Sequence, residues 1–482
     1  MSSYSFYARD QWQMSSRLTI SYGARYEYFP VPTRSDRGLE RYNPDTNMME
    51  IGGVGSVPRD LGIAAEKGLF APRVGATFRA SSSLVIRGGF GITNDPYSLA
   101  RPMRTNYPVL ANLVVQAPNA SFGWAGKTAD GVPPVPVPDL GNGIIPIQGN
   151  VTAITIPKDF NRGYIRSFNG AVQKELKWGF VGEAAYVGTR QIDQLGFLEL
   201  NWSPIGGGQA GRQLNKAFGR TAQTRLVAPI GDSKYDGLQT RLDRRFRNGV
   251  QLGVSYTLSK STGIAGAPDS DGAPRIMIPD YYSLNTALSP FDRTHNLNIT
   301  NVTELPFGPG KPWLKDGVGA AILGGWQVNN LISFWSGLPF DITASGTSLN
   351  APESSQRADQ VKDHVEILGG IGPNSPYFDP LAFKPVTEPR FGTAPWSAVR
   401  GPGYANWDFG LFRAIRMPHN SDLQIRCEVF NLLNTAHFNN PGGNVSNLQL
   451  NPDGTVRNLN GFAVVSSAYG ERQARIGVRF GW

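Results

Sequence analysis

The sequence predicts an all-β fold made of long antiparallel strands, and three observations support that prediction. Glycine and proline account for 57 and 36 of the 482 residues, which excludes a mostly helical chain. Hydrophobic residues reach 40% and aromatic residues 11%, so the chain is not disordered, while only 17% of residues are charged. Apolar and polar residues also alternate with a period of two over long segments, as they do in half-buried strands.

The alternating segments have the length and the two faces of membrane-spanning strands. In the segment 18–28 one face is apolar and aromatic, whereas the other carries Thr19, Ser21, Gly23, Arg25 and Glu27. A tilted strand needs about 9–11 residues to cross a bilayer, and the alternating segments reach that length. An apolar face toward lipid and a polar face toward the lumen are typical of a transmembrane β-barrel. We therefore expect an antiparallel transmembrane β-barrel in contact with outer-membrane lipid.

The chain divides into about 13 strands joined by alternately short and long links. We place the strands near residues 3–13, 18–29, 70–79, 84–93, 164–176, 180–188, 235–246, 250–262, 295–305, 325–343, 407–415, 423–432 and 472–482. The segment 325–343 is interpreted as one long strand with a kink at Gly337-Leu338-Pro339. Short links are typical of periplasmic turns and long ones of extracellular loops. Residues 1–482 then form one barrel portion, with loops at 30–69, 94–163, 189–234, 263–294, 344–406 and 433–471.

The strand count and the first residues predict a chain that starts within a barrel. Complete bacterial single-chain barrels have an even number of strands, whereas this count is odd. The first 17 residues contain Arg9, Asp10 and Arg17 and no apolar core, so they are not a signal peptide.

Eleven short motifs, kept in order along the chain, resemble the barrel of TonB-dependent receptors of the Oar-like type. They are FYARDQW (6–12), GARYEY (23–28), YDGLQTRLDRRF (235–246), SYTLSKS (255–261), FDRTH (291–295), ELPFG (304–308), GGWQ (324–327), SGLPF (336–340), RGPG (400–403), NWD (406–408) and EVFNLLN (428–434). The resemblance implies a barrel of about 22 strands, an N-terminal plug and often a carboxypeptidase-regulatory-like domain ahead of it. This chain departs from that pattern, and we expect it to be the C-terminal part of the barrel, without the plug.

Charged residues on the polar strand faces are the candidate solute-contacting groups. By strand parity, the side chains expected to face the lumen are Arg25, Glu27, Arg73, Arg87, Arg241, Asp243, Arg426, Glu428, Arg475 and Arg479. A basic lumen attracts anionic solutes, which is the functional interpretation. Cross-strand ion pairs and contacts with a plug explain the same residues structurally, and both interpretations stay open.

The last strand carries a candidate assembly signal. Ile476, Val478, Phe480 and Trp482 share one face, with an aromatic residue at the very end. The resemblance implies that a barrel-assembly machinery recognises such a final strand. The alternative is that Trp482 is only one more aromatic residue at the membrane interface.

Signals for catalysis, cofactors and nucleic acid are weak. The histidines lack the paired spacing of a metal site; they are His295, His364, His419 and His437. The single cysteine, Cys427, excludes a disulfide within the chain. The 46 Lys and Arg residues exceed the 37 acidic ones, but they are scattered, so we expect no nucleic acid. We also expect no enzymatic activity, no metal and no cofactor.

These features predict the barrel portion of an outer-membrane TonB-dependent receptor from a Gram-negative bacterium. In the full-length protein it would bind a small solute and take part in its uptake, and it would engage TonB only through a plug. A passive pore, or a structural or adhesive surface protein, would share the barrel but would never engage TonB. A secreted all-β hydrolase or adhesin is a further alternative, which solubility without detergent would reveal.

Overall fold

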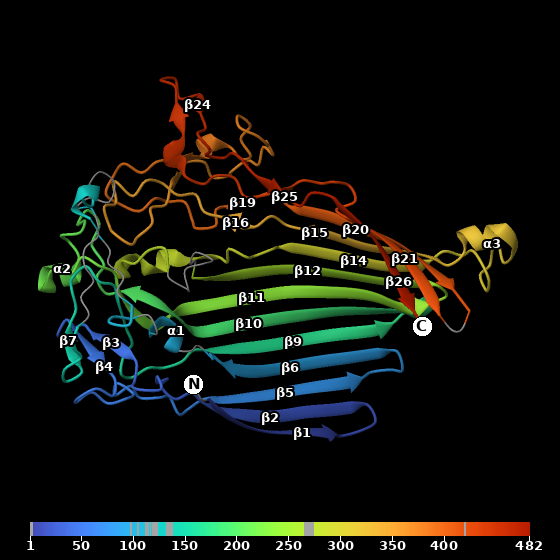
Figure 1. Cartoon of the computed structure of the whole chain (residues 1–482), viewed down its shortest axis with the longest axis horizontal. Helices are drawn as coiled ribbons and strands as arrows, with labels where there is room; N and C mark the ends of the chain where they lie inside the picture. Colours follow the sequence, from blue (N-terminus) through green and yellow to red (C-terminus); the bar gives the residue numbers. More distant parts are fainter. Residues whose placement is uncertain are drawn as a thin grey trace.

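One large antiparallel sheet dominates the structure (Figure 1). The structure is a computed structural model, and it describes residues 3–96, 99–103, 106–110, 115, 117, 124–131, 138–264, 274–418 and 421–482. The long strands follow one another in chain order along the sheet, which confirms the predicted number of 13 and their order. They are β1 (Tyr4–Gln13), β2 (Leu18–Tyr28), β5 (Phe70–Arg79), β6 (Leu84–Asn94), β9 (Tyr164–Glu175), β10 (Phe180–Glu199), β11 (Thr224–Arg247), β12 (Val250–Ile264), β14 (His295–Glu304), β15 (Trp326–Trp335), β20 (Tyr404–Arg416), β21 (Asp422–Phe430) and β26 (Gln473–Gly481).

The sheet has one polar and one apolar face. Polar and apolar side chains alternate along each strand, and directly opposite residues of neighbouring antiparallel strands share a face. Arg73 of β5, for example, lies opposite Gly23 of β2 and Gly91 of β6, and these residues belong to the polar face. The apolar face carries large side chains that remain between 40% and 49% exposed: Tyr22, Val74, Phe78, Ile86, Phe90, Val172, Tyr186, Leu238, Leu258 and Phe334. Exposed apolar side chains on such a scale indicate a face that meets lipid.

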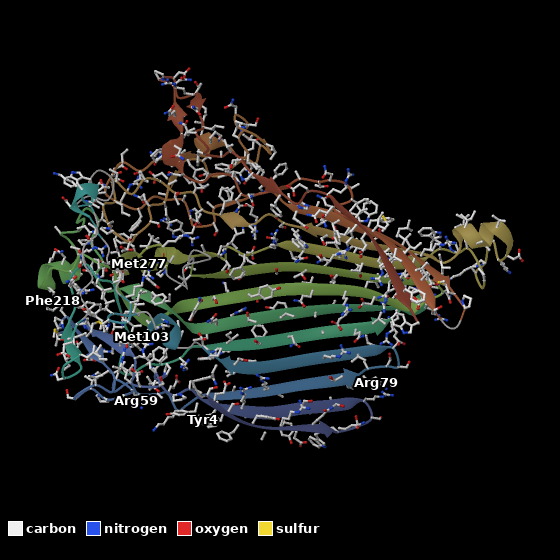
Figure 2. The ribbon with its side chains drawn as sticks, in the orientation of Figure 1. Tyr4, Arg59, Arg79, Met103, Phe218 and Met277 are labelled. Atoms are coloured by element: carbon white, nitrogen blue, oxygen red, sulfur yellow. The ribbon has the colours of Figure 1, made fainter. Side chains whose placement is uncertain are left out.

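Short and long links lie at opposite ends of the strands. Short turns gather at one end, here called the short-turn end, where Figure 2 labels Arg79. Long segments gather at the other end, the long-loop end, where Figure 2 labels Met103, Phe218 and Met277. The predicted alternation of short and long links is therefore confirmed.

The predicted loop 189–234 is too long. Strands β10 and β11 continue to pair until Glu199 lies opposite Arg225, so the link between them covers only residues 200–223. The register shifts between Gln191 and Leu195. Such a bulge shifts the period-two pattern by one residue, which hides the continuing strand from a reading of the sequence.

The segment 325–343 is not one strand, and that prediction was wrong. Strand β15 ends at Trp335, and β16 (Pro339–Phe340) pairs with β19 (Val399–Arg400) outside the main sheet. A Cβ atom on Gly337 would lie 1.8 Å from the carbonyl oxygen of Gly401, so only glycine permits this close approach. Pro339 also lacks the amide hydrogen that a strand within the sheet needs.

The long links fold into short elements instead of remaining irregular. Strands β3 (Glu40–Asn43), β4 (Met48–Ile51) and β7 (Ile144–Pro146) form a small sheet. The other short strands are β8 (Ala153–Thr155), β13 (Thr286–Leu288), β17 (Asp359–Gln360), β18 (Phe383–Lys384), β22 (His437–Phe438), β23 (Gln449–Leu450), β24 (Val456–Asn458) and β25 (Ala468–Tyr469). The helical segments are α1 (Ala100–Met103), η1 (Thr128–Asp130), η2 (Lys177–Gly179), α2 (Gln213–Phe218), η3 (Pro279–Asn285), α3 (Gly317–Leu323), η4 (Pro380–Ala382) and η5 (Val445–Asn447). Within the described part of the chain, no helix is long and apolar enough to cross a membrane.

Hydrophobic clusters join different long links to one another. One cluster contains Leu39, Met103, Phe197 and Met277, which come from four separate parts of the chain. A second cluster joins the segments around Phe378 and Phe462, whose rings meet edge to face at 5.3 Å. The long-loop end is therefore covered by a packed structure, here called the loop cap.

Candidate functional site

Strand register places the ten candidate lumen residues on the polar face of the sheet. Each acid of the set forms an ion pair with an arginine of the same set: Arg25 with Glu27 at 3.0 Å, Arg241 with Asp243 at 2.5 Å and Arg475 with Glu428 at 2.6 Å. Arg87 pairs with Glu183 at 3.1 Å. Two of these ion pairs join different strands, as the structural interpretation expected, whereas Arg25–Glu27 and Arg241–Asp243 each lie within one strand. The assignment of this face to a lumen stays a prediction.

Three of the candidate assembly residues lie on the outermost strand of the sheet, and Trp482 directly follows it. Strand β26 pairs with β21 along one edge, and within the described residues its other edge has no partner strand. Ile476, Val478, Phe480 and Trp482 are 80%, 68%, 50% and 94% exposed. Their shared face and exposure agree with the sequence pattern, but recognition by an assembly machinery stays a prediction.

Four of the sequence motifs meet where the polar face reaches the long-loop end. The guanidinium of Arg400 pairs with the carboxylate of Asp292, and its Nη1 donates to the backbone oxygen of Gly337 at 3.2 Å. The second oxygen of Asp292 accepts a hydrogen bond from the amide of Ser261 at 2.6 Å. The segments 255–261, 291–295, 336–340 and 400–403 are thus tied together by one ion pair and its hydrogen bonds.

Arg293, beside that ion pair, lines two neighbouring cavities. A cavity of about 120 Å³ is lined by Arg293, Leu338, Pro402, Gly403, Tyr404, His437, Phe438, Asn439, Asn440 and Tyr469. A second cavity of about 300 Å³ is lined by Tyr235, Gln239, Thr257, Ser259, Ser261, Phe291, Asp292, Arg293 and Asn296. The pair of cavities is here called the Arg293 pocket. Burial lowers the pKa of the Arg293 guanidinium below its ordinary value, yet the group stays a cation at neutral pH.

A row of rings runs beside the Arg293 pocket, and Tyr404, His437 and Tyr469 of this row line its smaller cavity. The ring centroids of Trp335 and Tyr404 lie 4.4 Å apart, those of Tyr404 and His437 4.2 Å, and those of His437 and Tyr469 5.5 Å. The Nε2 atom of His437 lies 3.1 Å from the carbonyl oxygen of Ala405 and so carries the hydrogen. This contact fixes the ring of His437, and Tyr469, at the end of the row, leaves half of its surface exposed.

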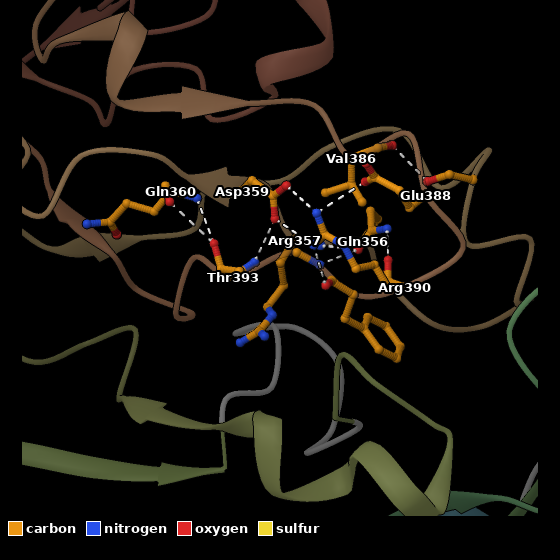
Figure 3. Close-up of polar contacts among 11 residues, drawn as sticks. Gln356, Arg357, Asp359, Gln360, Val386, Glu388, Arg390 and Thr393 are labelled. Carbon is orange, nitrogen blue, oxygen red and sulfur yellow. Dashed lines mark hydrogen bonds and ion pairs between the residues drawn. The ribbon is translucent and has the colours of Figure 1, made fainter.

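A separate polar network lies in the loop cap (Figure 3), and its residues line neither of the two cavities. The guanidinium of Arg390 donates to both carboxylate oxygens of buried Asp359, at 2.8 and 2.7 Å. The amide of Thr393 adds a third hydrogen bond at 3.1 Å, and Arg390 holds the pKa of Asp359 below its ordinary value. Because these groups satisfy one another, the network is structural and leaves no open site.

Sequence reasoning missed the Arg293 pocket, although it quoted the motif that contains Arg293. The motif FDRTH gave no sign of which charged residue would be paired and which would not. Tyr469 and His437 lie in the expected loop 433–471, and only the folding of that loop brings them to β20. The described residues contain no group of three or more histidine, cysteine or acidic side chains that could hold a metal ion, and His419 lies outside them.

The antiparallel sheet has long strands, one polar face and one exposed apolar face, and its long loops gather at one end. These features are typical of membrane β-barrel proteins. The family model described as the outer membrane beta barrel domain matches residues 1–475. The chain belongs to that family, and its place is the outer membrane of a Gram-negative bacterium.

Several solved structures are similar to the chain at low identity. The outer membrane transporter YddB from Escherichia coli is 11% identical, with a TM-score of 0.49, and the match covers 99% of this chain and 53% of that one. A mutant of the ferric enterobactin receptor PfeA from Pseudomonas aeruginosa is 9% identical, with a TM-score of 0.48, over 99% and 44% of the two chains. The chain therefore spans about half the length of these proteins. No curated protein matches it.

Proposed function

We propose that this chain is the barrel portion of a TonB-dependent receptor, which binds a solute at the long-loop end and takes part in its uptake across the outer membrane. The observation that carries the proposal is the meeting of four receptor-like motifs around the Arg293 pocket. A row of directly opposite residues also runs from Arg87 through Gln239 and Asn296 to Tyr404, so the pocket continues into the polar face.

Coupling to TonB separates this proposal from a passive pore or an adhesive surface protein. We expect the full-length receptor, in intact cells, to crosslink to the C-terminal domain of TonB, and solute uptake to stop when the proton gradient is abolished. Matched cells that lack TonB are the control. Uptake that continues without TonB, together with steady conductance in a planar bilayer, would indicate a passive pore instead.

A further inference from the structure

Arg293 is a partly buried cation whose hydrogen-bonding capacity is largely unused. Its Nη1 donates to the backbone oxygen of Ser336 at 2.6 Å, and its guanidinium lies 5.3 Å from the ring centroid of Trp335. A guanidinium has five N–H donors arranged as a fork, so donors remain. The nearest acid in the sequence, Asp292, is already engaged by Arg400 and Ser261. In the part of the chain that the structure describes, no carboxylate forms an ion pair with Arg293.

The surroundings of Arg293 are polar but neutral. Hydroxyl and amide groups line the larger cavity, among them Thr257, Ser259 and Asn296. Tyr404, Tyr469 and two asparagines line the smaller one. Among the lining residues, Arg293 is the one cation, and the charge of Asp292 is balanced by Arg400. The site therefore combines a single available positive charge with many uncharged hydrogen-bonding groups.

We propose that the Arg293 pocket binds a carboxylate carried by a hydroxyl-rich solute, such as an acidic sugar unit. The fork of the guanidinium matches the two oxygens of a carboxylate, which a point charge would not do. The solute's hydroxyl groups exchange hydrogen bonds with the hydroxyls of the larger cavity, and the exposed face of Tyr469 packs against its C–H groups. This inference rests on the proposed function, because it names the solute class that the receptor would take.

A matched pair of small probes tests the proposal. Glucuronate and glucose share one ring and differ in a carboxylate, so their difference in affinity reports the contribution of that group. We expect the full-length receptor in detergent to bind glucuronate at least tenfold more tightly than glucose, measured by saturation-transfer NMR and calorimetry. A tenfold ratio corresponds to about 1.4 kcal/mol. Equal binding of the two probes, or no binding of either, would overturn the proposal.

Variants at Arg293 locate the site. Arg293→Gln should remove the preference for glucuronate, and Arg293→Lys should retain a smaller preference, because a lysine keeps the charge but loses the fork. Arg457→Gln is the control, since it removes one exposed arginine of the loop cap that lines neither cavity. Tyr469→Phe, a second variant within the pocket, should weaken glucuronate binding a few fold. A preference that survives Arg293→Gln in folded protein would refute the assignment.

Competition by simple anions separates recognition of a sugar acid from attraction of any anion. We expect acetate and inorganic phosphate to compete with glucuronate only weakly, since neither reaches the larger cavity. Equal competition would reject the hydroxyl-rich solute. These binding measurements do not depend on TonB. A receptor that crosslinks to TonB but ignores glucuronate would therefore contradict this inference alone, whereas glucuronate binding without TonB coupling would contradict the proposed function alone.

Discussion

At the scale of single residues, two buried acids at the long-loop end have different surroundings, which shift their pKa values in opposite directions. Asp359 accepts two hydrogen bonds from Arg390, so its negative charge is stabilised by a bidentate ion pair with a guanidinium whose side chain is 42% exposed. Glu199 lies beyond Ile192, the last residue of β10 that pairs with β9, and is almost fully buried. Its Oε1 accepts hydrogen bonds from the amides of Asn201 and Thr224, at 2.9 and 2.8 Å, but its Oε2 has no partner. Burial therefore raises the pKa of Glu199 to about 7.

The raised pKa of Glu199 predicts a loop cap that loses stability as the pH rises. Between the ordinary glutamate pKa of about 4.3 and the native value, the folded state holds a proton that the unfolded state has released. The free energy of unfolding should therefore fall from pH 5 to pH 8, by up to about 3 kcal/mol for this single group. Glu199→Gln mimics the protonated acid, so it should abolish this part of the pH dependence. Urea unfolding in detergent, followed by tryptophan fluorescence, measures it. An unchanged pH profile in the variant would contradict the prediction.

At the scale of elements, the sequence predicted the long strands well and the short ones poorly. Alternation over ten residues, as in β2 and β5, follows from a local rule, because every second side chain meets the same environment. Strands such as β16 and β19 contain two residues each, too few to show a period. They form because Gly337 reaches the backbone of Gly401, a contact between segments far apart in the chain. The Arg293 pocket was hidden for the same reason, since it joins Arg293, Tyr404 and Tyr469.

Helix α3 shows how one element of the short-turn end is placed relative to the membrane. It projects beyond the sheet between β14 and β15 (Figure 1). Trp326, which belongs to the apolar face with Phe334, donates through Nε1 to the carbonyl oxygen of Ile322 at 2.9 Å. Arg413, opposite Trp326, donates to the carbonyl oxygen of Ala321. These contacts hold the end of α3 on the lipid-facing side.

We therefore predict that the exposed apolar residues of α3 enter the membrane interface. Val318 is 76% exposed and Ile322 58% exposed. Spin labels at either position, in a Cys427→Ser background, should be more accessible to oxygen than to a water-soluble nickel reagent, because oxygen concentrates in lipid. The same label at Arg457, in the loop cap, should show the opposite order. Equal behaviour at the three positions would place α3 in water.

At the scale of the whole molecule, the two outermost strands, β1 and β26, form the two edges of the sheet. Every residue of β1 is exposed, and β26 is exposed along nearly its whole length. Backbone groups at a free edge cannot be satisfied in hydrocarbon, so in the membrane both edges must be paired. The register of β26 therefore matters to the pairing of this edge, and we predict that its terminal residues have a role in assembly beyond packing.

The final aromatic residues allow these two roles to be separated. If Phe480 and Trp482 are only interface anchors, replacing both by Ser removes side-chain burial and costs about 1–3 kcal/mol for each. If they form a recognition signal, the loss should block assembly while synthesis continues. We predict the second result: in the full-length receptor, the double variant should sharply lower folded protein in the outer membrane, and unfolded chain should accumulate in the periplasm. Membrane fractionation and heat-modifiable migration measure both.

The matched control is Phe78→Ser with Phe90→Ser, which removes two aromatic residues of the same apolar face at 42% and 41% exposure. Equal losses in the two double variants would show that the terminal pair acts only through burial, because position within the chain would then make no difference.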